Sequence, residues 1–237
     1  MVFMIKFTKI KINSKLKIGL NVIFALISYT AAQTYLISIK NDILAVIVSI
    51  LFGLYFLIIQ LKDNHSEKPF WKNILNIFYN LGGILLSILA FNYFFKVGQS
   101  ENQESIKTIA QNVSVLKIAT LTCILAPIFE EYIFRYMFFT TPPEKPLINV
   151  SNYQSKYLKK NKDVLIFLPR LVVSSVLFAM IHMATTPLSS WSITMVPYMI
   201  IGWWLGLTRI QTKSSIYNIL LHSLYNSFAL AILLSTL

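Results

Sequence analysis

Seven mostly apolar stretches, each 17 to 25 residues long, constrain what this chain of 237 residues can fold into. An α-helix that crosses the hydrocarbon core of a bilayer needs about 20 predominantly apolar residues. Hydrophobic residues make up 56% of the chain and charged residues only 13%, a composition typical of membrane proteins. We therefore predict an all-α fold, a polytopic transmembrane helical bundle with about seven membrane-spanning helices. The expected spans cover approximately residues 18–39, 43–61, 74–95, 115–139, 164–187, 191–207 and 215–237.

The bundle is expected to form one structural unit, because no polar stretch between the spans is longer than roughly 25 residues. Residues 1–114 would supply three spans and an outer loop, and residues 115–237 would supply the other four spans. The first apolar run is longer than the h-region of a signal peptide, which normally has about 7–15 residues. We therefore expect a retained first span, and cleavage within residues 29–33 is the less favoured alternative.

The net charge of +12 is distributed as a membrane topology requires. With the N-terminus inside, fifteen Lys and Arg residues fall in inside segments and three in outside segments, as the positive-inside rule expects. This placement favours a cytoplasmic N-terminus and argues against nucleic acid as a partner. Lysine outnumbers arginine, and Ile and Asn are abundant, as in proteins from AT-rich bacterial genomes. We expect a multi-pass protein of the bacterial plasma membrane, with the lipid bilayer as its surroundings.

The fourth apolar run carries charges that a lone membrane helix would not tolerate. Glu130, Glu131 and Arg135 would cost about 8–10 kcal/mol near the centre of a span, at about 2.5–3.5 kcal/mol each. The twelve Val, Leu, Ile and Phe residues of this run return only about 4–7 kcal/mol. The rest of the bundle must therefore compensate these charges, and a functional site is the expected reason for keeping them.

The spacing of the three charges suggests how they divide their roles. Glu131 and Arg135 lie four residues apart, on one face of a helix, and can form an ion pair. Glu130 would then remain for chemistry, as a general base that activates water. Pro127 has no N–H to donate to the carbonyl of Cys123, so a kink of the helix is expected beside the carboxylates.

Two further pairs of residues lie four apart on later spans. Phe178 and His182 share a face of the fifth span, where an imidazole and a carboxylate could jointly deprotonate water. His222 and Asn226 share a face of the seventh span and carry donors that suit an oxyanion. Hydrogen bonding between helices is the alternative role for each polar side chain. His182 reaches the depth of Glu130 only if the fifth span extends to about residue 187.

These three motifs, in this order, resemble the CPBP family of CAAX proteases and bacteriocin-processing proteins, also called Abi. The family pattern is E-E-x-x-x-R, then F-x-x-x-H, then H-x-x-x-N, and the resemblance covers approximately residues 115–237. The sequence supplies the pattern with Glu130, Glu131, Arg135, Phe178, His182, His222 and Asn226. The basic insert from about 142 to 163 looks long for a compact bacterial member.

The resemblance implies an intramembrane endopeptidase. In that reading Glu130 and His182 activate water, while His222 and Asn226 bind the oxyanion. Glu131, Arg135 and Phe178 would support the site. Glu130, His182 and His222 could also ligate zinc, but the motif H-E-x-x-H is absent and metal-free activation of water uses the same residues. No cofactor is therefore favoured, and zinc stays the alternative.

The expected substrate is a peptide bond in a membrane-associated protein or in a peptide of the bacteriocin or pheromone type. Two other functions compete with this one. A non-catalytic bacteriocin-immunity or scaffold protein of the same family would keep the fold without the chemistry. A proton-coupled transporter would also bury carboxylates, although the sequence has no repeated halves of the kind that transporters often show.

Overall fold

The computed structural model describes residues 14–62, 66, 68–98, 100–139, 162–184 and 191–237, and this part of the chain contains helices and no strand. The all-α prediction is therefore confirmed. The N-terminal lysines up to residue 11, the predicted insert up to residue 161 and the expected end of the fifth span at 185–187 lie outside the described residues.

The described helices follow the predicted spans, with an additional polar helix between the third and the fourth. Their bounds are α1 (Ser14–Ser38), α2 (Asp42–Lys62), α3 (Phe70–Phe95), α4 (Glu101–Asn112), α5 (Val115–Ala119), η1 (Thr120–Leu125), α6 (Ala126–Glu131), η2 (Tyr132–Tyr136), α7 (Met137–Phe139), α9 (Lys162–His182), α10 (Trp191–Thr194), α11 (Val196–Thr212) and α12 (Ser215–Leu234).

Five of the described helices are long and apolar enough to cross a membrane by themselves: 19–38, 42–62, 70–95, 164–182 and 215–234. The other two expected spans are divided. Residues 115–139 run through five short helical segments without a break, and residues 191–207 are shared between α10 and the 17-residue α11. The chain is a multi-pass membrane protein.

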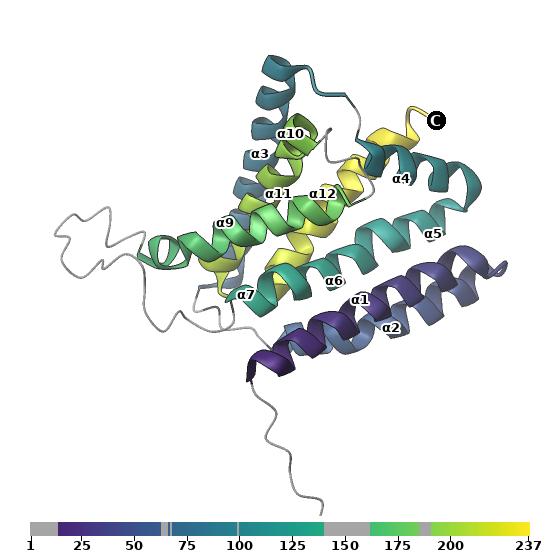
Figure 1. Cartoon of the computed structure of the whole chain (residues 1–237), viewed down its shortest axis with the longest axis horizontal. Coiled ribbons are helices and arrows are strands. Elements are labelled where there is room, and N and C mark those ends of the chain that lie inside the picture. Colours follow the sequence, from purple (N-terminus) through teal and green to yellow (C-terminus); the bar gives the residue numbers. More distant parts are fainter. Residues whose placement is uncertain (1–13, 63–65, 67, 99, 140–161, 185–190) are drawn as a thin grey trace, which may run out of the picture.

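The segment from α5 to α7, which carries the Glu pair and is called the central rod here, lies between two groups of helices (Figure 1). The α1–α2 hairpin packs along one side of the rod, and α12 packs along η1 and α6 on another. Helix α11 contacts α3, α9 and α12. Each predicted motif is therefore carried by an element that borders the central rod or by the rod itself.

Small residues allow α9 and α11 to approach closely. A Cβ atom at Gly202 would lie 3.0 Å from the Cα atom of Ser175, and one at Gly206 would collide with the Leu171 side chain. This is the behaviour expected of a small-x-x-x-small pattern in a membrane helix. The close packing brings the backbone of α11 near the polar groups of the central rod.

The central rod leaves α-helical geometry just before Pro127. In η1 the backbone is a π-helix, and the N–H of Ala126 donates to the carbonyl of Leu121, five residues back. Pro127 has no N–H of its own. The carbonyl of Thr122 thus loses both of its usual helical partners, and it must find a donor elsewhere.

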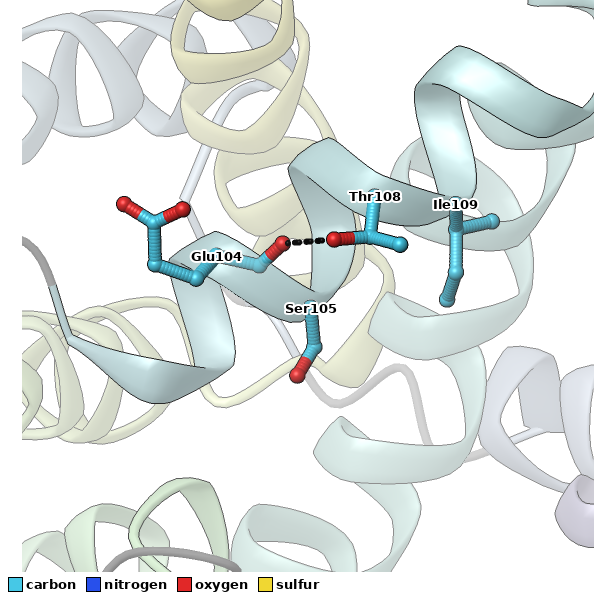
Figure 2. A pocket seen from close by; sticks show the side chains of 4 residues that line it. All are labelled: Glu104, Ser105, Thr108 and Ile109. Carbon is cyan, nitrogen blue, oxygen red and sulfur yellow. Dashed lines mark hydrogen bonds between the residues drawn. The ribbon is translucent and has the colours of Figure 1, made fainter.

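A shallow depression lies on the outer helix α4. Figure 2 shows its lining residues Glu104, Ser105, Thr108 and Ile109, with the hydroxyl of Thr108 donating to the carbonyl of Glu104 at 2.9 Å. All four residues come from one turn of a polar helix, and none belongs to the three motifs. We assign no function to this depression.

Candidate active site

Glu130 lies on α6, where the side chains of two histidines from other helices meet it. Its Oε2 atom lies 3.7 Å from Nε2 of His182, at the end of α9, and 3.7 Å from Nε2 of His222, on α12. The structure therefore brings one residue from each of the three motifs together at one point. His182 is the last residue of α9, and from that position its side chain already faces Glu130. The side chains of Glu130 and His182 are 14% and 16% exposed, whereas His222 is almost fully buried.

The second ring nitrogen of each histidine is already engaged. Nδ1 of His182 donates to the carbonyl of Phe178 at 2.7 Å, and Nδ1 of His222 donates to Oε1 of Glu131 at 2.8 Å. Carbonyl and carboxylate oxygens only accept, so each Nδ1 carries the hydrogen. In a neutral ring, Nε2 then presents a lone pair toward Glu130.

The Oε2 atom of Glu130 is buried and has no hydrogen-bond partner within the described chain. A gap of 3.7 Å to each Nε2 atom is too long for a direct hydrogen bond. Polar atoms at such a separation are often bridged by one water molecule. A water molecule at this position would donate one hydrogen to Oε2 of Glu130 and the other to an imidazole Nε2. The lone pairs of its oxygen would then point away from both groups.

Glu131 binds three side chains. Oε1 accepts from Nδ1 of His222 and lies 3.3 Å from Nη1 of Arg135, and Oε2 accepts from Nδ2 of Asn218 at 2.7 Å. Arg135 also donates from Nη2 to the carbonyl of Gly202 at 3.1 Å. Glu131 and Arg135 are fully buried. Groups from α11 and α12 therefore stabilise the charges of Glu131 and Arg135, for which the sequence of their own span offered no compensation.

Phe178 packs among the charged and imidazole groups. The guanidinium carbon of Arg135 lies 4.4 Å from the centre of its ring, a distance at which cation–π attraction operates. The ring centre of His182 lies 4.4 Å from that of Phe178, and the ring centre of His222 lies 5.8 Å away, in an edge-on arrangement. Phe178 therefore separates Arg135 from the two imidazoles and limits how they can turn.

Asn226 supplies the donor that the Thr122 carbonyl lacks. Its Nδ2 atom donates to this carbonyl at 2.8 Å, beside the point where Pro127 interrupts the helix ladder. A carboxamide carries two N–H groups. One hydrogen of Asn226 is therefore committed to the backbone, and the other is left for a second acceptor.

Three residues of the site were not predicted from the sequence: Asn218, Tyr198 and Gln60. Asn218 lies four residues before His222, so the i,i+4 pattern of α12 extends one step further back and could have indicated it. The ring of Tyr198 stacks on that of His182 at 4.8 Å, and Gln60 donates to the carbonyl of Ile128 at 2.8 Å. Nothing in the local sequence marks these two positions.

No group of three or more His, Cys, Asp or Glu side chains in the described ranges is arranged to hold a metal ion. Two ligands bound to zinc at about 2.0 Å with tetrahedral angles lie about 3.3 Å apart. The oxygen of Glu130 stands 3.7 Å from each imidazole nitrogen. This spacing is wider than that of zinc ligands by about 0.4 Å, and no metal-holding group is found in the described ranges, so no step below is derived through a metal.

An apolar groove of about 990 Å³ runs beside the site, between α1, η2, α7 and α9. Met180 and Ile181, which flank it, immediately precede His182, and the groove extends along α9 as far as Arg170. Arg170 donates from Nη1 to the carbonyl of Phe138 at 3.0 Å. Glu130, His182 and His222 are not among the residues that line the groove, which borders the helix that carries His182.

Comparison with known proteins identifies the family. A family model for type II CAAX prenyl endopeptidases of the Rce1-like kind matches residues 112–228 of the sequence. This range includes all three motifs. No curated protein and no solved structure matches the chain significantly. The members of this family are intramembrane proteases, which agrees with a multi-pass helical bundle that buries a pair of carboxylates. The chain therefore belongs, through residues 112–228, to the Rce1-like family of type II CAAX prenyl endopeptidases.

Proposed function

We propose that the protein is a glutamate-dependent intramembrane endopeptidase that hydrolyses a peptide bond without a metal ion. The observation that carries this proposal is the unpaired, buried Oε2 atom of Glu130, which faces the Nε2 atoms of His182 and His222 at 3.7 Å. A water molecule that lies beside this pair would be within hydrogen-bond reach of both groups. General-base catalysis needs such a group within reach of the water, directly or through one bridge.

In the first step, a water molecule donates one hydrogen to Glu130 and the other to Nε2 of His182. Glu130 removes a proton as the water oxygen attacks the carbonyl carbon of the substrate. A C–O bond forms, and the electron pair of the carbonyl double bond moves to its oxygen. The product is a tetrahedral oxyanion with a protonated Glu130.

In the second step, Glu130 returns the proton to the amide nitrogen of the intermediate. The C–N bond breaks, the oxyanion regains its double bond, and a new carboxyl terminus and a new amino terminus leave. The same side chain thus acts first as a base and then as an acid. This exchange leaves Glu130 ready for the next water molecule.

The oxyanion would be stabilised by His222 and by the uncommitted amide hydrogen of Asn226. Because Nδ1 of His222 donates to Glu131, Nε2 can donate only when the ring carries both hydrogens. The proposal therefore includes His222 in the form that carries both hydrogens.

The substrate is proposed to be a peptide or a membrane-associated protein that enters from the bilayer along the apolar groove next to His182. No nucleic acid is proposed as a partner. The charge pattern of the sequence supports a site on the cytoplasmic half of a bacterial plasma membrane, with the N-terminus inside. Substrates of the bacteriocin or pheromone type remain our proposal.

Membranes from cells that produce the wild-type chain or Glu130→Gln test the proposal. Proteomic comparison of new peptide termini should reveal products that are present with the wild type and absent with the variant, while both proteins accumulate equally. Equal product patterns would contradict the protease assignment. If the associated phenotype also survived Glu130→Gln and His182→Ala, the non-catalytic immunity or scaffold function would replace it.

A further inference from the structure

We propose that Asn218 is a positioning residue for His222: its amide holds the carboxylate of Glu131 in the orientation that keeps Nδ1 of His222 protonated and Nε2 turned toward Glu130. This inference rests on the proposed function in that it concerns how the reacting groups are placed. It assigns a role to a residue outside the three motifs.

Asn218 joins three helices at a fully buried position. From α12, its Nδ2 atom donates to Oε2 of Glu131 on α6 at 2.7 Å and to the carbonyl of Leu205 on α11 at 2.9 Å. Its exposed fraction is 0%. Both amide hydrogens are therefore used, and the carboxamide cannot turn without breaking a buried hydrogen bond.

The hold on Glu131 matters because a competing partner lies next to it. The Nε and Nη1 atoms of Arg135 are buried and have no hydrogen-bond partner within the described chain. Guanidinium and carboxylate groups favour a two-pronged arrangement with parallel N–H···O bonds. If Asn218 released Oε2 of Glu131, the carboxylate would turn toward this fork and take Oε1 away from His222.

The consequence for His222 follows from its present partners. The bond of 2.8 Å between Nδ1 and Oε1 of Glu131 sets which ring nitrogen carries the hydrogen. A His ring whose orienting carboxylate is lost can turn over or lose the hydrogen on Nδ1. The N–H on Nε2 would then no longer be directed toward the oxyanion, as the proposed chemistry requires.

The first experiment reads the ring directly and does not depend on cleavage. The protein is labelled with ¹⁵N-histidine in detergent micelles, and the signal of His222 is identified by its loss in His222→Gln. Wild-type protein should show a protonated Nδ1 that is hydrogen-bonded to a carboxylate, and Asn218→Leu should show loss of that hydrogen bond or of the Nδ1 hydrogen. A wild-type ring protonated at Nε2 alone, or an unchanged spectrum in Asn218→Leu, would overturn the proposal.

Asn80→Leu is the matched control. Asn80 is also a fully buried asparagine, and its Nδ2 atom donates to Thr208 at 2.7 Å and to Gln211 at 3.0 Å. The Oδ1 atoms of Asn80 and Asn218 both lack a hydrogen-bond partner within the described chain. The control should lose stability to a similar extent and keep the wild-type signal of His222.

The second experiment measures turnover of a substrate found by the proteomic comparison. Per folded molecule, Asn218→Leu should lower kcat about 10- to 100-fold, a loss typical of residues that orient a reacting side chain, and leave KM within a factor of about two. Asn80→Leu should leave both unchanged. If Asn218→Leu does not fold, Asn218→Ser gives the same test, and an unchanged kcat there would also overturn the proposal.

The two outcomes separate this inference from the proposed function. Loss of the Nδ1 hydrogen bond of His222 in Asn218→Leu without any Glu130-dependent cleavage would support Asn218 as the positioning residue and contradict the protease. Glu130-dependent cleavage with an unaltered His222 signal would do the reverse.

Discussion

The amide of Asn226 donates to the backbone carbonyl of Thr122 at 2.8 Å, and this carbonyl is the one that the π-helical turn and Pro127 leave without a helical donor. The third motif therefore binds the backbone of the helix that carries the first motif. Asn226 therefore has a structural role in addition to any contact with substrate. A variant at Pro127 can separate the two roles, because only the hydrogen bond to the Thr122 carbonyl depends on that proline.

Asn226→Leu should reduce the free energy of unfolding by about 1 kcal/mol, because the partly buried carbonyl of Thr122 loses its donor. Pro127→Ala adds an N–H next to that carbonyl and should lessen the loss. Reversible unfolding in detergent of the wild type, both single variants and the double variant gives the coupling between the two positions. Strict additivity of the two changes would show that the freed carbonyl is not what Asn226 satisfies.

Arg135→Leu should destabilise the protein by about 3–5 kcal/mol, because it leaves the buried carboxylate of Glu131 without its ion-pair partner. Arg135→Lys should recover only part of this loss, since an ammonium group cannot reproduce the contacts of a planar guanidinium. Thermal unfolding in detergent measures both. Lys62→Leu, at an exposed end of α2, is the control and should change stability by less than about 0.5 kcal/mol.

Phe56→Ala should lower stability by about 3–5 kcal/mol and reduce cleavage, although α2 lies outside the matched family region. The ring of Phe56 is 1% exposed and packs on Phe129 at 5.0 Å and on Tyr132 at 4.8 Å, on both sides of the Glu pair. Tyr55→Ala changes a neighbouring ring that is 54% exposed and should have little effect. Equal effects of the two variants would mean that α2 does not support the central rod.

Purified protein should contain no stoichiometric zinc and should keep its activity in a strong chelator. The reason is the donor set: in the part of the chain that the structure describes, no group of three or more His, Cys, Asp or Glu side chains is arranged to hold a metal ion. Elemental mass spectrometry and activity after chelation measure the two quantities. One zinc per chain, with activity lost on chelation and restored by zinc, would require a metal-dependent mechanism.

The sequence was sufficient for the parts of this structure that depend on one helix at a time. The lengths of the apolar runs predict the helices, and an interval of four residues places Glu131 beside Arg135 and Phe178 beside His182. The meeting of Glu130 with His182 and His222 was expected from the motifs. The depth of His182 could not be fixed, because the end of its span could not be read from composition.

The contacts between helices could not be predicted, because they depend on more than one helix at a time. Gln60 and Tyr198 are defined by a partner on another helix, and no local pattern records that partner. The π-helical turn η1 depends on a donor more than 100 residues away, Asn226. Pro127 indicated that the helix ladder would fail there, but not how the backbone would absorb the failure.

The hydrogen bond of Gln60 limits which helices could replace the first three spans in a chimera. Its side chain is fully buried and donates to the carbonyl of Ile128, two residues before Glu130, from a helix that the family model does not include. A chimera that replaces the first three spans with those of another membrane protein would retain every motif residue. It would still deprive the central rod of a donor at Ile128, so the foreign helix must bring a polar side chain of its own to the same level.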